Sequence, residues 1–145
     1  MKRILFLFFM FFAVGAQARE LISPLGYWQT INEKTHQPGS IVHITQEGRT
    51  FVGRIEKLLP GSVFKTSDVC VKCTGVNKNK PIVGLKFLWG FVDDGKGGLT
   101  DGSVMDPNNG KVYSGDMEVK DHGKKLELRG YWGPFWRTET WYRAN

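Results

Sequence analysis

Apolar and polar side chains alternate along most of the chain after residue 20, and no window shows the three- and four-residue apolar spacing of a helix. Alternation with a period of two places apolar side chains on one face of a β-strand and polar side chains on the other. Turn-forming residues separate the alternating runs. The pattern predicts an all-β protein whose eight strands cover residues 25–31, 41–46, 50–59, 85–93, 99–105, 111–119, 124–132 and 135–143.

The connections between these predicted strands are short, with one exception. Gly48 can supply the positive φ that a tight hairpin needs, and residues 106–110 read Asp-Pro-Asn-Asn-Gly, a strong turn signal. Between residues 60 and 81 the alternation stops, and Gly, Lys, Asn, Ser and Thr predominate. Loops of this length are uncommon in compact domains and are typically functional or mobile.

Consecutive strands joined by short turns favour an antiparallel up-and-down arrangement. Closing such a sheet into a single eight-stranded barrel leaves no unpaired strand edge, and a barrel of this size is filled by side chains or holds one small ligand. We therefore expect an eight-stranded antiparallel up-and-down barrel, with a two-sheet β-sandwich as the alternative.

The alternation also predicts which side chains line the barrel interior. Residues 85, 87, 89 and 91 fall on one face of their strand, and the polar face of strands 111–119 and 124–132 should meet water. The predicted ligand-lining set is aromatic and methionine side chains, namely Phe87, Trp89, Tyr113, Met117 and Trp132. Arg129 and Arg137 are candidates to meet an anionic group at the barrel mouth, although solvated strand positions are the simpler interpretation.

The N-terminus has the three parts of a secretory signal peptide. Lys2 and Arg3 precede an apolar run over residues 4–15, and Ala-Gln-Ala at residues 16–18 provides the cleavage pattern. The run is too short for a bilayer span, which needs about 20 residues. The first cysteine is Cys70, so a lipid-anchored form has no cysteine at the cleavage point. We expect cleavage after Ala18 and a soluble, exported chain.

Removal of 18 of the 145 residues leaves 127, enough for one domain over residues 19–145. The net charge of +6 falls to +4 when Lys2 and Arg3 leave, and the remaining basic residues are spread thinly. This distribution argues against a nucleic-acid partner. We expect a monomer whose partner is a small hydrophobic ligand or an envelope protein.

Cys70 and Cys73 are the only cysteines. Three interpretations compete: a local disulfide formed on export, a redox-active pair, and half of a metal site. Export favours the disulfide, which would constrain the long loop rather than the fold. Redox activity of the thioredoxin type needs a helix beside a βαβ unit, which is absent, and no histidine shows zinc-ligand spacing.

Sequence motifs of catalysis are absent: there is no Gly-x-Ser-x-Gly elbow, no His-Glu-x-x-His and no phosphate loop. Asp93, Asp94 and Asp101 lie near glycines and carry the oxygen ligands that calcium prefers, but without the spacing of a calcium loop. A solvated turn is the simpler interpretation. We expect no cofactor, no metal and no catalytic residue.

Trp28 lies in the first predicted strand and Arg143 in the last. In a closed barrel these two strands are neighbours, so the guanidinium can stack on the indole and close one end of the barrel. We interpret this pair as a closure device rather than a catalytic site.

A succession of motifs resembles one family of small exported bacterial proteins, domain of unknown function 2147. The motifs are Gly26-Tyr27-Trp28, Gly53-Arg54-Ile55, Cys70-Val71-Lys72-Cys73, Pro81-Ile82-Val83-Gly84-Leu85, Asp106-Pro107-Asn108-Asn109-Gly110-Lys111-Val112-Tyr113, Leu128-Arg129-Gly130-Tyr131 and Trp141-Tyr142-Arg143. The resemblance implies a Gram-negative periplasmic protein with a lipocalin-like barrel and no established activity. One departure is the bulky Pro134-Phe135-Trp136, where the family is expected to have a glycine.

Three functions remain open at this point. The first is a non-enzymatic binding module that holds a small, largely apolar molecule in the barrel. The second is an interaction or structural protein that contacts an envelope partner through residues 60–81. The third, least favoured, is a thiol-disulfide role of Cys70 and Cys73.

Overall fold

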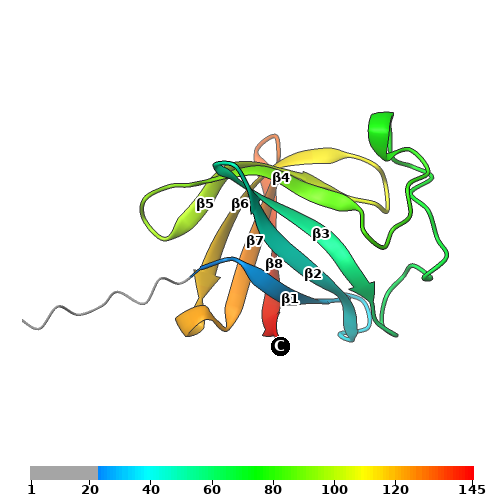
Figure 1. Ribbon diagram of the computed structural model, residues 1–145, viewed down its shortest axis with the longest axis horizontal. Helices are drawn as coiled ribbons and strands as arrows, with labels where there is room; N and C mark the ends of the chain where they lie inside the picture. The colour runs from blue at the N-terminus through cyan, green and yellow to red at the C-terminus, as the bar shows by residue number, and fades with distance from the viewer. Residues whose placement is uncertain (1–22) are drawn as a thin grey trace, which may run out of the picture.

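Eight antiparallel strands follow one another in chain order around a closed barrel (Figure 1). The computed structural model describes residues 23–145, so the predicted signal peptide over 1–18 and its cleavage site lie outside the described residues. The strands are β1 (Gly26–Ile31), β2 (Pro38–Glu47), β3 (Thr50–Leu58), β4 (Lys86–Asp93), β5 (Gly98–Met105), β6 (Val112–Lys120), β7 (Lys125–Trp132) and β8 (Phe135–Ala144).

The predicted barrel is therefore confirmed, and the β-sandwich alternative is wrong. Seven strands begin and end within one residue of the predicted bounds, whereas β2 begins three residues early, at Pro38. The reason is pairing: Pro38 is the register partner of Ile31, and Ser40 is that of Thr30. Two short 3-10 helices, η1 (Gly75–Asn77) and η2 (Asp121–Gly123), complete the structure. Within residues 23–145, no helix is long and apolar enough to cross a membrane.

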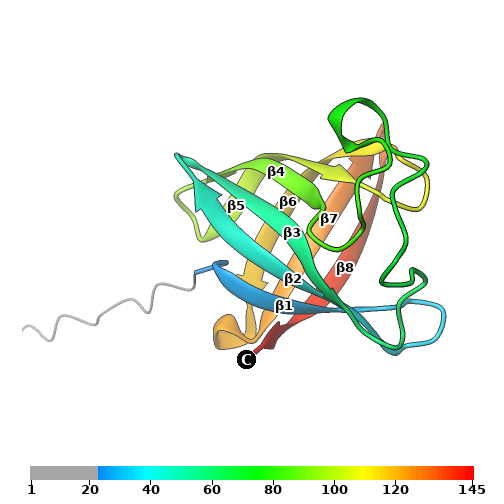
Figure 2. The ribbon, with the colours of Figure 1, turned by 45° about the vertical axis from the view of Figure 1, so that its right-hand side comes forward.

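The up-and-down order sends the connections to two opposite ends of the barrel (Figure 2). One end, called the closed end below, carries the start of β1, the end of β8 and the connections β2–β3, β4–β5 and β6–β7. The other, called the loop end, carries the connections β1–β2, β3–β4, β5–β6 and β7–β8. The long connection between β3 and β4, residues 59–85, belongs to the loop end.

Large side chains fill the interior toward the closed end. Trp28, Phe91 and Trp141 are at most 2% exposed. Glycines make room for them: a Cβ on Gly102 would overlap the Phe91 ring, and a Cβ on Gly115 would lie 2.6 Å from Cγ2 of Val104. This part of the barrel is a packed core.

A β-bulge changes the alternation predicted for β4. Gly53 is the register partner of Leu88, whereas Arg54 is that of Lys86, so Phe87 is an extra residue. Phe87 and Leu88 are consequently both buried. The prediction that residues 85, 87, 89 and 91 share one face is therefore wrong at position 89. Trp89 follows the inward-facing Leu88, belongs to the other face of β4 and is half-buried.

The closed end is sealed by Arg143 stacked on Trp28. The two residues are register partners of β8 and β1, and the guanidinium carbon lies 4.0 Å from the centre of the indole ring. Arg143 also donates three hydrogen bonds to backbone carbonyls: Nε to Gly123 at 2.9 Å, Nη1 to Leu25 at 2.6 Å and Nη2 to Ser23 at 2.8 Å. The side chain thus ties the first strand, the last strand and the β6–β7 connection together.

Replacement of Arg143 by Ala is expected to lower the free energy of unfolding by about 2–4 kcal/mol, because it removes one cation–π contact and leaves three carbonyls without their donor. Urea denaturation of the purified protein measures this change. Arg129→Ala is the matched control, since Arg129 is exposed on the outer face, and its cost should stay below about 1 kcal/mol. Equal effects of the two substitutions would contradict the sealing role.

Candidate functional site

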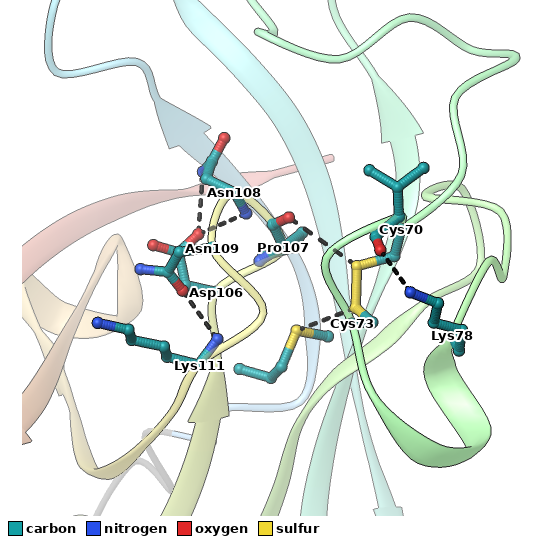
Figure 3. The surroundings of a disulfide bond; sticks show 10 residues. Cys70, Cys73, Lys78, Asp106, Pro107, Asn108, Asn109 and Lys111 are labelled. Atoms are coloured by element: carbon teal, nitrogen blue, oxygen red, sulfur yellow. Dashed lines mark hydrogen bonds between the residues drawn. A yellow bond between two sulfur atoms is a disulfide. The ribbon is translucent and has the colours of Figure 1, made fainter.

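The long connection 59–85 is anchored at the loop end by a disulfide between Cys70 and Cys73 (Figure 3). Both cysteines are only 1% exposed and belong to the hydrophobic core cluster. Sγ of Cys73 lies 3.5 Å from Sδ of Met105, and Sγ of Cys70 lies 3.9 Å from the carbonyl oxygen of Pro107. The disulfide favoured by the sequence is thus present, and it packs against the end of β5.

The β5–β6 turn is shaped to receive this disulfide segment. Asp106 Oδ1 accepts a hydrogen bond from the backbone N–H of Asn108 at 2.8 Å, and Asn109 Oδ1 accepts one from Lys111 N–H at the same distance (Figure 3). A Cβ on Gly110 would overlap the carbonyl of Lys72, and Gly110 has a φ of +73°. The Asp-Pro-Asn-Asn-Gly turn therefore packs directly against the disulfide segment, and Gly110 allows this close approach.

Burial of both sulfur atoms bears on the redox interpretation. Thiol-disulfide exchange requires an attacking thiolate to approach one sulfur of the bond. Cys70 and Cys73 are covered by the chain on all sides, at 1% exposure each. The geometry favours a structural bond.

Open space lies on the β7–β8 side of the loop end, beside Gly130. Gly130 is the register partner of Gly115 and shares the inward face of β7 with the buried Leu126 and Leu128. A Cβ built on Gly115 meets three atoms within 3.3 Å, whereas one built on Gly130 meets nothing within 4 Å. Close packing therefore ends at Gly115, and the space next to Gly130, called the hollow below, is open.

Charged side chains of β8 border this hollow. Arg137 is the register partner of Gly130, and both Arg137 and Glu139 share the inward face of β8 with the buried Trp141. The side chains of Arg137 and Glu139 are nevertheless 65% and 40% exposed. Inward-facing groups with this exposure indicate that water enters the barrel here.

The charged groups are linked to one another. Arg137 forms an ion pair with Glu33 of the β1–β2 turn, in which Nε donates to Oε1 at 3.1 Å. Nη2 of Arg137 also lies 3.5 Å from Oε1 of Glu139, whose Oε2 accepts a hydrogen bond from the indole N–H of Trp141 at 3.2 Å. A carboxylate is thus held at the junction between the hollow and the packed core.

The Glu33–Arg137 ion pair lies where the first and last strands are no longer paired with each other. The β1–β8 ladder has three residue pairs, against eight between β7 and β8. β1 ends at Ile31, so the part of β8 nearest the loop end extends beyond it, and the two ribbons diverge from the closed end in Figure 2. The ion pair joins β8 to the β1–β2 turn where the ladder is missing.

Burial raises the pKa of Glu139 above its ordinary value of 4.5, and the nearby carboxylates of Glu33 and Asp106 act in the same direction. The hydrogen bond from Trp141 and the charge of Arg137 oppose this rise only in part. The hydrogen bond to Glu33 raises the pKa of Arg137, which stays charged. The hollow is therefore bordered by a permanent cation beside a carboxyl group whose pKa is raised above its ordinary value.

Comparison with known proteins identifies the family of the chain. A family model described as "Uncharacterized protein conserved in bacteria (DUF2147)" matches residues 26–143, nearly all of the described chain. The chain belongs to the DUF2147 family. Comparison with curated protein sequences gave no match.

A solved structure places this DUF2147 member among lipocalin-like folds. Protein HP1028 from Helicobacter pylori, which is described as belonging to the lipocalin family, matches with a TM-score of 0.72 and 22% sequence identity. The match covers 85% of this chain and 84% of that one. At this identity the likeness concerns the fold alone.

The residues that the sequence suggested for ligand contact lie in different places in this DUF2147 protein. Phe87 and Met117 are buried in the packed core, and Tyr113 is half-buried, with its hydroxyl accepting from Asn109. Trp132 is 68% exposed at the rim rather than in the interior wall, because it is the last residue of β7. Trp89 belongs to the other face of β4 and is half-buried, in contact with the core cluster.

The two candidate arginines face opposite sides of the barrel wall. Arg137 borders the hollow, whereas Arg129 lies on the outer face, where its Nε donates to Oγ1 of Thr138 at 3.2 Å. Arg129 instead borders a shallow polar groove of about 320 Å³, together with Asp116, Glu118 and Glu127. Of these two arginines, Arg137 is the one placed to meet an anionic group inside the barrel.

Two functional candidates were missed in the sequence, Gly130 and Glu139. Glu139 is separated from Trp141 by one residue, so alternation within β8 was the signal for its inward position. The calcium interpretation finds no support in the part of the chain that the structure describes, where no three potential ligands gather. Asp93 and Asp94 instead accept backbone hydrogen bonds from Gly95 and Lys96 at 2.7 Å.

Replacement of Glu139 by Gln is expected to raise the stability of the protein at neutral pH. A carboxyl group with a raised folded-state pKa lowers the stability of the fold as the pH rises from its ordinary pKa through the folded-state pKa, because partial burial disfavours its charged form. The advantage of Glu139→Gln should shrink as the pH falls and vanish well below the ordinary pKa of 4.5, where the carboxyl group is protonated in both the folded and the unfolded wild type. Urea denaturation at several pH values tests this, and a Gln variant less stable than the wild type at pH 7 would contradict it.

Proposed function

We propose that this DUF2147 protein is an exported, non-enzymatic binding module that holds a small, largely apolar molecule at the loop end of its barrel. The open space beside Gly130 carries the proposal, since a Cβ there has no neighbour within 4 Å. The packed core around Phe91 and Trp28 fills the closed end, so it restricts the ligand to the loop end of the barrel. A lipocalin-like fold supports this kind of use.

The lining of the hollow favours a ligand with an apolar body and one polar group. Leu128, two residues before Gly130 on the inward face of β7, is buried, so the packed core next to the hollow is apolar on this strand. Arg137 and Glu139 on the neighbouring strand provide one cationic and one carboxyl group. A few convergent polar groups in a mainly apolar site fix the orientation of a ligand.

Gly130→Leu tests this function, because it fills the hollow at a position without strained backbone or crowding neighbours. The probe is 1-anilinonaphthalene-8-sulfonate, which has an apolar body and one anionic group, and its fluorescence reports binding. We expect saturable binding by the wild type and about a tenfold or greater loss in the variant, since lost apolar burial and steric blockage both oppose binding.

Ser114→Leu is the matched control. It adds the same side chain to the exposed outer face of β6, next to Gly115, and should leave probe binding unchanged. The melting temperatures of both variants verify that each is folded. Equal probe binding by the wild type and a folded Gly130→Leu variant would contradict a site in the hollow.

We also propose that the protein acts in the periplasm. The basic, apolar and small-residue segments over residues 1–18 support export, and the Cys70–Cys73 disulfide fits an oxidising compartment. Intact-mass measurement of protein purified from the periplasmic fraction should give a chain that begins at Arg19 and lacks two hydrogens because of the disulfide. A full-length chain found only in the cytoplasm would contradict this location.

A further inference from the structure

Exposed apolar side chains are concentrated at the loop end of the barrel. Among the described residues, eleven large apolar or aromatic side chains are exposed, and eight of them lie in the loop-end connections or in the strand ends next to these. They are five valines and three aromatic residues. The other three, Leu25, Tyr27 and Tyr142, lie near the closed end.

The most pronounced part of this surface is the β7–β8 hairpin tip. Trp132, Phe135 and Trp136 are 68%, 66% and 64% exposed, and Gly133 and Pro134 between them add no charge. The rings of Trp132 and Phe135 lie 6.2 Å apart. An uncharged tip with two tryptophans has the composition of segments that enter the interfacial region of a bilayer.

Lysines accompany the exposed valines of the same end. The connection 59–85 contains four lysines, Lys65, Lys72, Lys78 and Lys80, and a single acidic residue, Asp68. Its exposed valines include Val76, at 81%, the most exposed of the eleven. This connection and the β7–β8 hairpin emerge from the same end of the barrel in Figures 1 and 2. The loop end thus combines apolar tips with excess positive charge.

The combination of exposed apolar side chains with lysines distinguishes a bilayer surface from a protein as the partner of the loop end. The core of a protein–protein interface is depleted in lysine. An anionic bilayer, in contrast, attracts lysines electrostatically while aromatic side chains enter the headgroup region. We propose that the loop end docks on the surface of an anionic phospholipid bilayer, with the 132–136 hairpin inserted among the headgroups. The open side of the barrel then faces the membrane.

The test uses the exported chain and vesicles of phosphatidylcholine, with or without phosphatidylglycerol. Flotation measures the bound fraction of the protein. The tryptophan fluorescence of the protein should shift to shorter wavelength, because the indoles of Trp132 and Trp136 leave water on binding. We expect binding to the anionic vesicles, weak binding to phosphatidylcholine alone, and loss of binding at high salt because the lysines are screened. Absence of binding to anionic vesicles at low salt overturns the proposal.

Two variants separate the aromatic and the basic contributions. Trp136→Ser should lower partitioning onto anionic vesicles about tenfold, because the apolar area of one exposed ring is lost. Lys72→Gln with Lys80→Gln should weaken binding and flatten its salt dependence. Tyr142→Ser, an exposed aromatic residue near the closed end, is the matched control and should bind like the wild type.

Circular dichroism establishes that each variant is folded, and Phe135→Ser replaces Trp136→Ser if that variant does not fold. Sedimentation velocity over a range of protein concentrations tests the competing occupant, a second copy of the chain. Self-association that Trp136→Ser abolishes, without vesicle binding by the wild type, overturns the proposal in favour of a dimer. Equal vesicle binding by Trp136→Ser and Tyr142→Ser overturns the role of the hairpin.

Discussion

The stacking of Arg143 on Trp28 is the contact on which the rest of the barrel depends, because it joins the first strand to the last. The β1–β8 ladder is short, and backbone pairing alone would leave the seam weakly held. The three hydrogen bonds of Arg143 add the β6–β7 connection to the same anchor. With one end sealed in this way, the β1 and β8 strands can diverge toward the other end without opening the barrel.

Inward-facing glycines determine how much of the interior is available. The side chains of Phe91 and Val104 occupy the space beside Gly102 and Gly115, so the interior next to these two glycines is packed. Gly130 lies on the next strand, β7, where no neighbouring side chain occupies the space beside the glycine, so this space is open. The same residue type thus lies against packed side chains on β5 and β6 and beside open space on the neighbouring strand β7.

The strand order and nearly all strand bounds followed from the alternation of side chains, because each hairpin is local and each strand has one apolar face. The position of Trp89 did not follow, because the bulge at Phe87 depends on the register of β4 against β3, which is a long-range property. The pairing of Trp28 with Arg143 followed from the closure of the barrel. The hollow beside Gly130 did not, because a glycine in a strand looks the same whether its neighbours fill the space or leave it empty.

The central claim is that the barrel is sealed and packed at one end and open to a ligand at the other. A crystal structure of the protein purified from its own envelope tests this claim most directly. The account predicts ordered water or a bound molecule between Gly130, Arg137 and Glu139, and none between Trp28, Phe91 and Trp141. Side chains that fill the space beside Gly130 would contradict it.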